Sequence, residues 1–413
     1  MGEEGCQPQA MPWTGQRAIP RTPVLSADTF LQRGEAEIPC LLDVGLPRFF
    51  AAGRYALLRA LQDAAIGAGD AVLVPAYHCG AMIAPILEVG AIPVFYPLEP
   101  DLSIDPHALT AKLTAAVRAL IAVHYFGFVQ DMAALRRFSD DHGLCLIEDC
   151  AHAFFGTYGA KPVGWHGDYA IGSIMKFFPT TDGGCLISRR HEPAAGRPLA
   201  AGLRRSTKAA VNTLEYALDY RRMGPAASIL KPLLSVKDRI LARNKKERSA
   251  YGEGDTVAMA ILPDESDEND LSLDASLFGR SATLPAKLTV AAASRSRIVE
   301  RRRANFLRIL SAVQGLPDCR PLFPRLPEGV VPWVFPIVFD DVAAAYARLD
   351  RQGVPIPHFG KNLWHGMNPA VCGVSLALSK NCLQFPCHQE LQDQELQWLI
   401  DRIVGAMQRT ARL

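Results

Sequence analysis

Ile147-Glu148-Asp149-Cys150-Ala151-His152 is a segment in which an apolar run ends in two carboxylates and a histidine. The apolar run begins at Leu144. A short apolar run that is bounded by polar residues is typical of a strand buried in a parallel sheet. Because ligands bind at the carboxyl ends of the strands in such sheets, we expect Asp149 to border a binding site.

Strands and helices are predicted to alternate on both sides of this segment. Helices are predicted at 54–65, 79–89 and 131–142, and strands at 71–74, 92–96, 116–124, 144–148, 170–173 and 184–188. Such alternation indicates a mostly parallel central sheet with right-handed crossovers. We therefore expect an α/β protein whose large domain has this sheet at its centre, flanked by helices.

The chain has 413 residues, which is long enough for more than one domain. We expect an N-terminal arm at 1–40, a large α/β domain at 41–280 and a smaller α+β domain at 281–413. The large domain would include a helical insertion or linker at 190–275, where basic clusters and an acidic run interrupt the pattern. In the small domain the predicted elements are helices at 284–314, 342–352 and 389–407 and strands at 333–339 and 383–386.

The bulk composition excludes several classes of protein. The formal net charge of +2 gives no reason to expect a nucleic acid or an acidic membrane as a partner. No apolar run is long enough to span a bilayer, and residues 1–30 lack the apolar segment of a signal peptide. The ten cysteines form no CxxC pair, so we expect reduced thiols, no zinc site and a cytoplasmic protein.

Lys176 follows Asp149 by 27 positions (176 − 149) and stands between apolar residues just before Thr181-Asp182-Gly183-Gly184. A strand-end aspartate that is paired with a later lysine is what a pyridoxal 5′-phosphate (PLP) site needs. The carboxylate of Asp149 would keep the ring nitrogen protonated, and Lys176 would form the Schiff base and move a proton during amino transfer. The alternatives are structural. Asp149 could be the N-cap of a helix, and the aliphatic part of Lys176 could pack against the protein while its amine reaches solvent.

Gly53 and Arg54 open the first predicted helix and are candidates to bind the phosphate group of PLP. Backbone N–H groups at a helix N-terminus attract anions. Gly53 permits a close approach, and Arg54 would add a positive charge. Ser173 is placed to give a hydroxyl to the same phosphate, although a serine in this position is more commonly a plain strand end.

Tyr77, His78 and Cys79 follow the strand that ends at Pro75. This strand end is expected at the same edge of the sheet as Asp149. One of the three residues is therefore expected to cover a face of the cofactor ring. Tyr77 and His78 are the better stacking partners because their side chains are aromatic.

Two further histidines follow predicted strands. His152, one turn after Asp149, is placed to contact the phenolic oxygen of PLP, with a purely structural role as the alternative. His124 ends another predicted strand and is expected to orient its neighbours rather than to react. These histidines could in principle bind a metal together with His78 and Cys79, but no ligand spacing supports this, so we predict no metal site.

Beyond these single residues, several segments resemble, in sequence and in order, the DegT/DnrJ/StrS-type family of PLP-dependent sugar aminotransferases, which have the aspartate aminotransferase fold (fold type I). The resemblance covers about 49–190 and resumes weakly at 280–410. The segments that carry it are AGRYALLRAL (52–61), GAGDAVLVPAYHC (67–79), GAIPVFYPLEPDLSIDPHAL (90–109), ALIAVHYFGFVQDMAAL (119–135), GLCLIEDCAHAFFGTY (143–158), VGWHGDYAIGSIMKFFPTTDGGCLI (163–187) and LQFPCHQELQDQELQWLIDRI (383–403).

The resemblance implies roles for individual residues. Lys176 matches the Schiff-base lysine, and Asp149 matches the aspartate that binds the ring nitrogen. His152 stands where the family has glutamine or histidine, and Gly53 with Arg54 matches the phosphate turn. A branch of the family with histidine in place of the lysine performs dehydration, so Lys176 indicates transamination.

The chain departs from the family pattern at several positions. Arg54 replaces a hydroxyl residue, Cys79 stands where an aromatic usually stacks on the ring, and Ser173 is closer to the lysine than usual. The asparagine that a partner subunit lends to the phosphate site is not evident. DYRRM (219–223) and FGRS (278–281) are rival candidates for that segment.

The resemblance implies an enzyme, a PLP-dependent aminotransferase that moves an amino group from glutamate or glutamine to a keto-sugar, with a nucleotide-linked sugar as the leading hypothesis. The alternative is a PLP-dependent enzyme of natural-product biosynthesis that acts on an amino acid or another non-sugar substrate. A non-catalytic sensor or scaffold is a third. We expect a homodimer with shared active sites, and a substrate pocket from loops 189–280 and 357–368, with His358, Trp364 and His365 as candidates.

Overall fold

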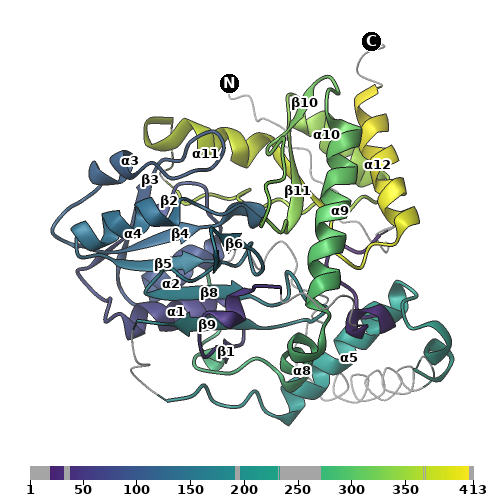
Figure 1. Cartoon of the computed structure of the whole chain (residues 1–413), viewed down its shortest axis with the longest axis horizontal. Helices are drawn as coiled ribbons and strands as arrows, with labels where there is room; N and C mark the ends of the chain where they lie inside the picture. Colours follow the sequence, from purple (N-terminus) through teal and green to yellow (C-terminus); the bar gives the residue numbers. More distant parts are fainter. Residues whose placement is uncertain are drawn as a thin grey trace, which may run out of the picture.

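The computed structural model describes residues 19–31, 38–190, 196–230, 232, 271–365, 367 and 369–408. Among these residues, a seven-stranded sheet forms the larger part, and a three-stranded sheet is built from the C-terminal part. In Figure 1 the large sheet lies on the left, and the small sheet lies beside the long helix α9. The expected α/β class with a mostly parallel central sheet is confirmed.

The large sheet has the strand order β1-β9-β8-β5-β4-β2-β3. Strands β3, β2, β4, β5 and β8 are parallel to their neighbours in this series, whereas β9 is antiparallel to β8 and to β1. All five residues of β2 and of β8 are buried, as expected for strands covered on both faces. The strands are β1 (Arg48–Phe50), β2 (Ala71–Pro75), β3 (Ile92–Tyr96), β4 (Val117–Val123), β5 (Cys145–Asp149), β8 (Tyr169–Ser173) and β9 (Gly184–Ser188).

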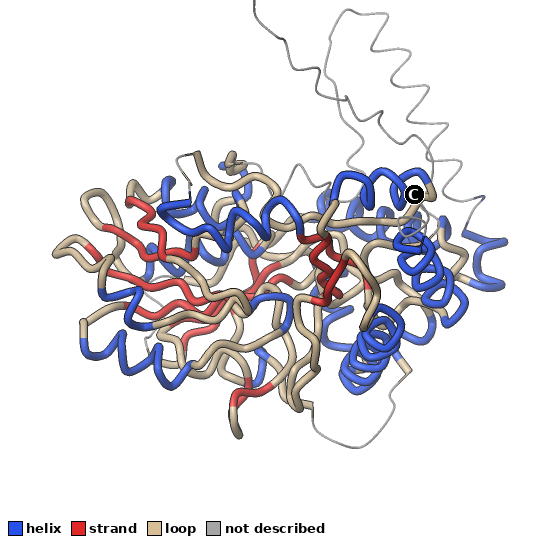
Figure 2. The backbone as a smooth tube through the Cα atoms, turned by 90° about the horizontal axis from the view of Figure 1, so that it is seen from above, coloured by secondary structure: helices blue, strands red, loops and turns tan. Residues whose placement is uncertain are grey.

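Helices cover both faces of this sheet, as Figure 2 shows. Helix α1 packs against β8, β9 and α2, and α4 packs against β5. Asp131 is the N-cap residue of α4, because its carboxylate accepts the N–H of Ala134 at 3.0 Å. The helices of this part are α1 (Gly53–Asp63), α2 (Gly80–Glu88), α3 (Pro106–Thr110) and α4 (Met132–Asp141), and the three predicted ones agree with these bounds to within two residues.

The small sheet is antiparallel, in the order β10-β11-β12. Helices α9 and α12 lie side by side next to it (Figure 1). A single hydrophobic cluster joins the buried side chains of both sheets, and the predicted domain boundary at 280 stays a prediction. The elements are β10 (Cys319–Pro321), β11 (Val334–Phe339), β12 (Cys382–Pro386), α9 (Arg295–Val313), α10 (Val342–Arg351), α11 (Pro369–Asn381) and α12 (Asp393–Gln408).

The prediction of one long helix at 284–314 is wrong. Two helices, α8 (Leu284–Ala292) and α9, meet at Ala293 and Ser294, whose backbones are extended with ψ angles of 142° and 105°. The hydroxyl of Ser294 accepts the N–H of Arg297 at 3.4 Å and so caps α9. This break turns α9 toward the small sheet, while α8 stays beside α5 at the lower right of the large sheet in Figure 1.

Only part of the predicted insertion at 190–275 is described. It contains helix α5 (Leu203–Asp219), which packs against α8. The basic cluster at 243–248, the acidic run at 264–270 and residues 1–18 of the predicted arm lie outside the described residues. The remaining elements are short: η1 (Ala27–Phe30), η2 (Leu41–Asp43), η3 (Tyr125–Gly127), η4 (Gly224–Ala226), η5 (Ala275–Leu277), β6 (Thr157–Tyr158) and β7 (Lys161–Pro162).

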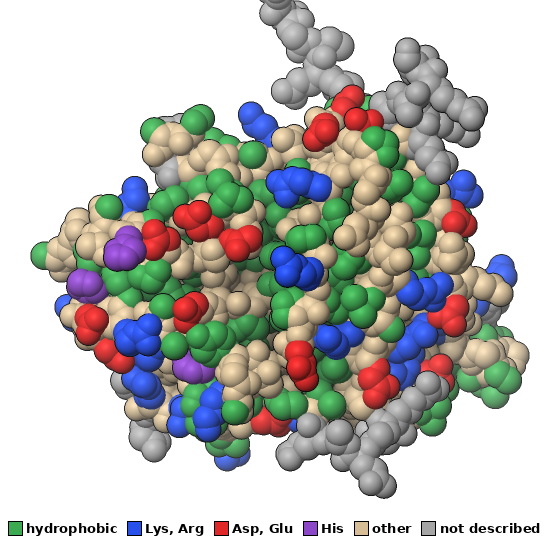
Figure 3. Space-filling view, turned by 45° about the horizontal axis from the view of Figure 1, so that its top comes forward, with side chains coloured by type: hydrophobic (Ala, Val, Ile, Leu, Met, Phe, Trp, Pro, Cys, Tyr) green, Lys and Arg blue, Asp and Glu red, His purple; other side chains and the backbone are tan. Residues whose placement is uncertain are grey.

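Two surface properties bear on the possible partners. Among the described residues, every helix is too short or too polar to cross a bilayer. Charged side chains of both signs are scattered over the face of the molecule shown in Figure 3. That face therefore offers no broad field of one sign, in keeping with the small net charge.

Candidate active site

Asp149, His152 and Lys176 meet at one edge of the large sheet. Asp149 is the last residue of β5, His152 lies in the turn that follows, and Lys176 lies in the turn after β8. Because β5 and β8 are neighbouring parallel strands, their carboxyl ends share this edge. The positive charge of Lys176 interacts electrostatically with both other side chains. The structure thus brings together the three residues for which the sequence predicts catalytic roles, and those roles stay predictions.

The carboxyl group of Asp149 is buried at the sheet edge. Burial raises the pKa of Asp149 above its ordinary value, although the N–H of Ala151 and the charge of Lys176 act in the opposite direction. The hydrogen bond from Ala151 reaches Oδ1 at 2.9 Å. Since a nearby cation favours the charged form of a buried carboxyl group, Asp149 is suited to hold a protonated ring nitrogen.

His152 is packed among aromatic rings. It stacks on Trp333, with ring centroids 4.0 Å apart and 27° between the planes, and on Phe126, with 5.6 Å and 10°. Burial, and then the charge of Lys176, lowers the pKa of His152 well below its ordinary value, so the imidazole is neutral. Its Nδ1 atom is buried without a hydrogen-bond partner among the described residues. Such an atom is rare in proteins and can bind a polar group of a ligand.

The side chain of Lys176 rests on Trp333, which the sequence did not suggest as a site residue. The Nζ atom lies 4.2 Å from the centroid of the Trp333 ring, at the distance of a cation–π interaction. Trp333 directly precedes β11 and is 157 positions after Lys176 (333 − 176). The sequence showed only a tryptophan at the start of a predicted strand. Nothing local indicates that this strand begins opposite the end of β8.

The predicted phosphate turn lies at the N-terminus of α1, and its role stays a prediction. Gly53 is the first residue of α1, and a Cβ added to it would lie 3.8 Å from the Cβ of Ser173, so the two candidates are neighbours. The Gly183-Gly184 turn packs on this helix end. Gly183 has a φ of +119°, and a Cβ on Gly184 would overlap the backbone of Ala52. The glycines therefore allow the close packing that leads the chain from the lysine turn to the helix N-terminus.

Arg54 points toward a different neighbour. Its Nη1 atom donates to the carbonyl of Ser272 at 3.4 Å, at an exposed position. The FGRS segment borders the phosphate turn of its own chain, because the carbonyl of Arg280 accepts the N–H of Ala51 at 2.9 Å. Arg222 of the DYRRM segment forms an ion pair with α12. The contribution of Arg54 to the phosphate site, and the choice between the two segments, stay predictions.

The three candidates for covering the ring are held in different ways. The hydroxyl of Tyr77 donates to the carbonyl of Phe359 at 2.8 Å. In His78, Nε2 accepts the N–H of Trp364 at 2.9 Å, so Nδ1 carries the hydrogen and donates to the last carbonyl of β2 at 3.2 Å. Burial lowers the pKa of His78 to about 4. Cys79 is the buried N-cap residue of α2. Which of the three covers the ring stays a prediction.

The segment 357–368, predicted to line the substrate pocket, borders these residues through the contacts just described. Nε2 of His358 lies 2.8 Å from the carbonyl of Ser379, and burial lowers the pKa of His358. The rings of Trp364 and His365 are 4.3 Å apart. Since His358 already has a structural partner, Trp364 and His365 are the better candidates for contact with a substrate.

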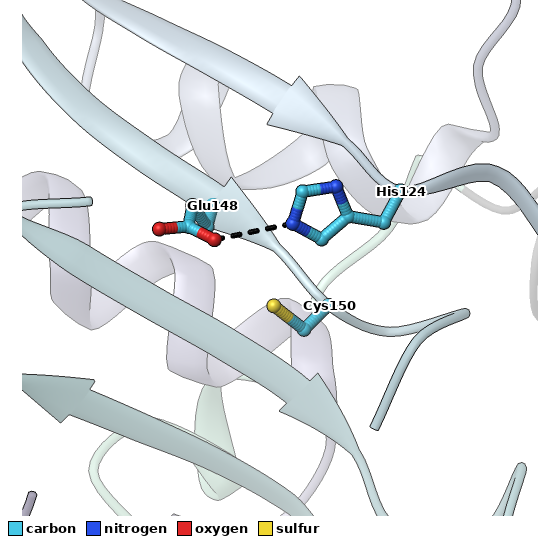
Figure 4. Close-up of side chains that lie close together, drawn as sticks. All are labelled: His124, Glu148 and Cys150. Carbon is cyan, nitrogen blue, oxygen red and sulfur yellow. Dashed lines mark hydrogen bonds and ion pairs between the residues drawn. The ribbon is translucent and has the colours of Figure 1, made fainter. Parts of the chain in front are cut away.

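His124, Glu148 and Cys150 form a buried cluster whose donor atoms lie within 4.8 Å of one another (Figure 4). Nδ1 of His124 accepts the N–H of Gln130 at 3.3 Å, so Nε2 carries the hydrogen and donates to Glu148 at 3.1 Å. Burial alone would raise the pKa of Glu148, but this bond and N–H groups from 164–167 hold the pKa below its ordinary value. Because the carboxylate oxygens already accept these hydrogen bonds, we interpret the cluster as structural rather than as a metal site.

The described residues fit PLP. Asp149 offers a buried carboxylate to the ring nitrogen, and Lys176 offers an amine to the aldehyde. The N-terminus of α1 at Gly53 offers backbone N–H groups to the phosphate. His152 offers a neutral nitrogen, as yet unpartnered, to a polar substituent of the ring. These four groups would hold the cofactor.

Several known proteins that are similar to this chain are named as aminotransferases. The L-glutamine:2-deoxy-scyllo-inosose aminotransferase of Streptoalloteichus tenebrarius is 37% identical over 147 residues, which cover 35% of each chain. The GDP-perosamine synthase of Vibrio cholerae is 33% identical over 168 residues, which cover 40% of this chain and 46% of the relative. This chain thus spans less than half the length of these curated relatives. The crystal structure of aminotransferase TlmJ from Streptoalloteichus hindustanus shares the fold, with a TM-score of 0.60 at 19% identity over 88% of this chain and 86% of that one.

A model of the DegT/DnrJ/EryC1/StrS aminotransferase family matches residues 49–254. Within the described residues, the match includes the end of β5, the lysine turn and the N-terminus of α1. The family that the sequence resembles is therefore confirmed. This chain belongs to the DegT/DnrJ/EryC1/StrS aminotransferase family.

Proposed function

We propose that this protein is a PLP-dependent aminotransferase that transfers an amino group from an amino acid to the keto group of a sugar. The observation that carries the proposal is the meeting of Asp149, His152 and Lys176 at one sheet edge. The names of the two curated relatives support a sugar-like acceptor. The fold and the family membership agree with this activity.

Each residue has a distinct task in this proposal. When bound, PLP supplies an aldehyde that receives an amine and a ring that withdraws electrons from the reacting carbon. Lys176 holds the cofactor and moves a proton at its Nζ atom. Asp149 keeps the positive charge on the ring nitrogen. His152 orients the ring through Nδ1, and Trp333 with Phe126 keeps water away from the imidazole.

We propose glutamine or glutamate as the amino donor. The name of the Streptoalloteichus relative, which contains L-glutamine, supports glutamine as the first donor to test. The two relatives differ in the acceptor, since one is named for an inosose and the other for a GDP-linked product. A nucleotide-linked keto-sugar and a keto compound without a nucleotide are therefore both tested.

The test is a two-stage assay of the purified protein loaded with PLP. Glutamine or glutamate alone should change the absorbance spectrum of the cofactor and release the matching keto acid. Addition of an inosose or of a GDP-linked keto-sugar should then restore the first spectrum and give an aminated product in mass spectrometry. An acceptor added without a donor is the control. A spectrum that no amino donor changes would contradict the proposal.

We also propose that the protein is a homodimer. Four leucines with exposed fractions between 57% and 84% lie in α8, in the first turn of α5 and shortly before α5, and we propose that they form one leucine patch: Leu199, Leu203, Leu284 and Leu288. The N–H of Leu284 lies 3.5 Å from the hydroxyl of Ser206, which joins α8 to the start of α5. Apolar patches of this kind mark interfaces. The patch also borders the FGRS segment and so the phosphate turn, where a second copy would lie next to the site.

Leu288→Glu should convert the dimer into monomers, because a charge in the centre of an apolar interface loses its hydration without gaining a partner. Sedimentation velocity measures the change. Ile92→Glu is the matched control, since Ile92 is exposed to a similar degree, 58% against 59%, on the far edge strand β3. A wild-type protein that sediments as a monomer, or a Leu288→Glu variant that stays dimeric, would contradict the proposed interface.

A further inference from the structure

Arg302 in α9 connects the turn of Lys176 to the segment of Trp333. The side chain is fully buried. Its Nη2 atom donates to the carbonyl of Lys176 at 2.8 Å, and its Nη1 atom donates to the carbonyls of Trp333 at 3.0 Å and Pro332 at 3.1 Å. One guanidinium group therefore fixes the distance between two backbone segments that are more than 150 residues apart in the chain (333 − 176 = 157).

The neighbouring side chain of Gln389 completes this connection. Nε of Arg302 donates to Oε1 of Gln389 at 2.8 Å, and Nε2 of Gln389 donates to the carbonyl of Phe177 at 2.8 Å. The guanidinium also lies 4.4 Å from the centroid of the Phe177 ring. The carbonyls of Lys176 and Phe177, which follow one another in the chain, are thus both held by side chains of the C-terminal part.

A buried cation in this place is costly. Burial lowers the pKa of Arg302 to about 10, although Cys387 and Glu390 act in the opposite direction. Among the described residues, no carboxylate lies within ion-pair distance of Arg302. An apolar side chain of similar volume would fill the same space without the desolvation cost. The charge and the fork of donors are therefore better explained by what they hold in place than by a gain in stability.

The Arg302 side chain holds the backbone of Lys176, which carries the reactive amine, and the backbone of Trp333, whose ring the amine contacts. The Nζ atom of Lys176 rests 4.2 Å from the centroid of the Trp333 ring, and the same ring stacks on His152. A shift of the Lys176 backbone relative to the Trp333 backbone would separate the amine from this surface. Misplacement of a reacting group by about 1 Å can cost about 10²-fold in rate.

We propose that Arg302 is a positioning residue, which sets where Lys176 projects its amine over Trp333. The proposal rests on the proposed function, because it assigns to Lys176 the amine that holds the cofactor and moves the proton. Arg302 does not touch the reacting atoms in this proposal. It acts through the backbone carbonyls of the two segments, with Gln389 as its second arm.

The main test is Arg302→Lys, which keeps a charge but loses the planar fork of donors. We expect turnover to fall by about 10²-fold with little change in KM for the amino donor. We also expect added PLP to attach to Lys176 more slowly, a step followed by borohydride reduction and mass spectrometry of the Lys176 peptide. A purely structural role would not slow this attachment in a folded protein. Gln389→Met should also lower turnover and slow the attachment of PLP, but by smaller factors. This variant replaces Arg302→Lys in the test if Arg302→Lys does not fold.

Two variants serve as controls. Arg301→Lys alters the preceding residue of α9, which pairs with Asp393 and donates to the carbonyl of Leu391, whereas these hydrogen bonds do not reach the lysine turn. Val313→Ala creates a cavity at a fully buried position of the same helix. This variant controls for any loss of thermal stability that Arg302→Lys causes. The inference is overturned if Arg302→Lys behaves like Arg301→Lys, or if Val313→Ala gives the same losses at an equal fall in Tm. A wild-type protein that shows no half-reaction with any donor refutes the proposed function instead, so the two failures are distinguishable.

Discussion

Lys176→Ala should abolish turnover. It should also remove the absorbance band that PLP shows when it is covalently attached to a lysine. Alanine can neither attach to the aldehyde nor move a proton, and the second of these tasks alone is worth about 10²- to 10⁴-fold in rate. We therefore expect turnover to fall by about 10³-fold or more. Spectroscopy of the PLP-loaded variant and a coupled assay for the released keto acid measure the two effects.

Lys380→Ala is the matched control for this change, because Lys380 is exposed in the last turn of α11 and removal of its amine takes away the same charge. That variant should retain the wild-type spectrum and turnover. A Lys176→Ala variant that kept the lysine-linked absorbance band would show that another amine binds the cofactor. The assignment of Asp149 and His152 to the same site would then lose its basis.

Asp149→Asn should lower turnover by about 10²- to 10³-fold, which is the usual cost of removing one electrostatic contact to the reacting system. The buried carboxylate would no longer favour a proton on the ring nitrogen, and the neutral amide cannot replace its charge. The lysine-linked absorbance band should persist, because Lys176 is unchanged. The expected signature is therefore a large loss of kcat in a protein that still attaches its cofactor, as measured by steady-state kinetics and absorbance.

Asp101→Asn is the control for this second change. Asp101 is exposed and accepts the N–H of Ser103 at 3.0 Å, a contact that the amide oxygen of asparagine can also make. Its turnover should equal that of the wild type. Equal turnover in Asp149→Asn and Asp101→Asn would show that the carboxylate at the end of β5 only caps the following turn, which is the structural alternative that the sequence leaves open.

The sequence predicted the large sheet well and the C-terminal helices less well. Six of the seven strands in the described large sheet were predicted, because they contain apolar runs, for example at Val72 and Ile147, that can be recognised without knowledge of the fold. The short strand β1, which begins with Arg48, was not predicted. The error at 284–314 arose because the residues on both sides of Ser294 are good helix formers. A serine is compatible with a helix interior, and only the extended backbone at Ala293 and Ser294 shows that Ser294 caps a new helix.

By itself, the sequence determined most strands of the large sheet, the resemblance to the family, and two candidate site residues, Asp149 at a strand end and Lys176 before a glycine turn. These follow from local patterns, because a strand end and a glycine turn depend on residues that are close together in the chain. Only the tertiary structure decided that Trp333 lies under the amine and that Arg302 ties the two segments together. Both facts depend on how β11 and α9 pack against the end of β8. No local pattern encodes that packing, since it results from the burial of many side chains at once.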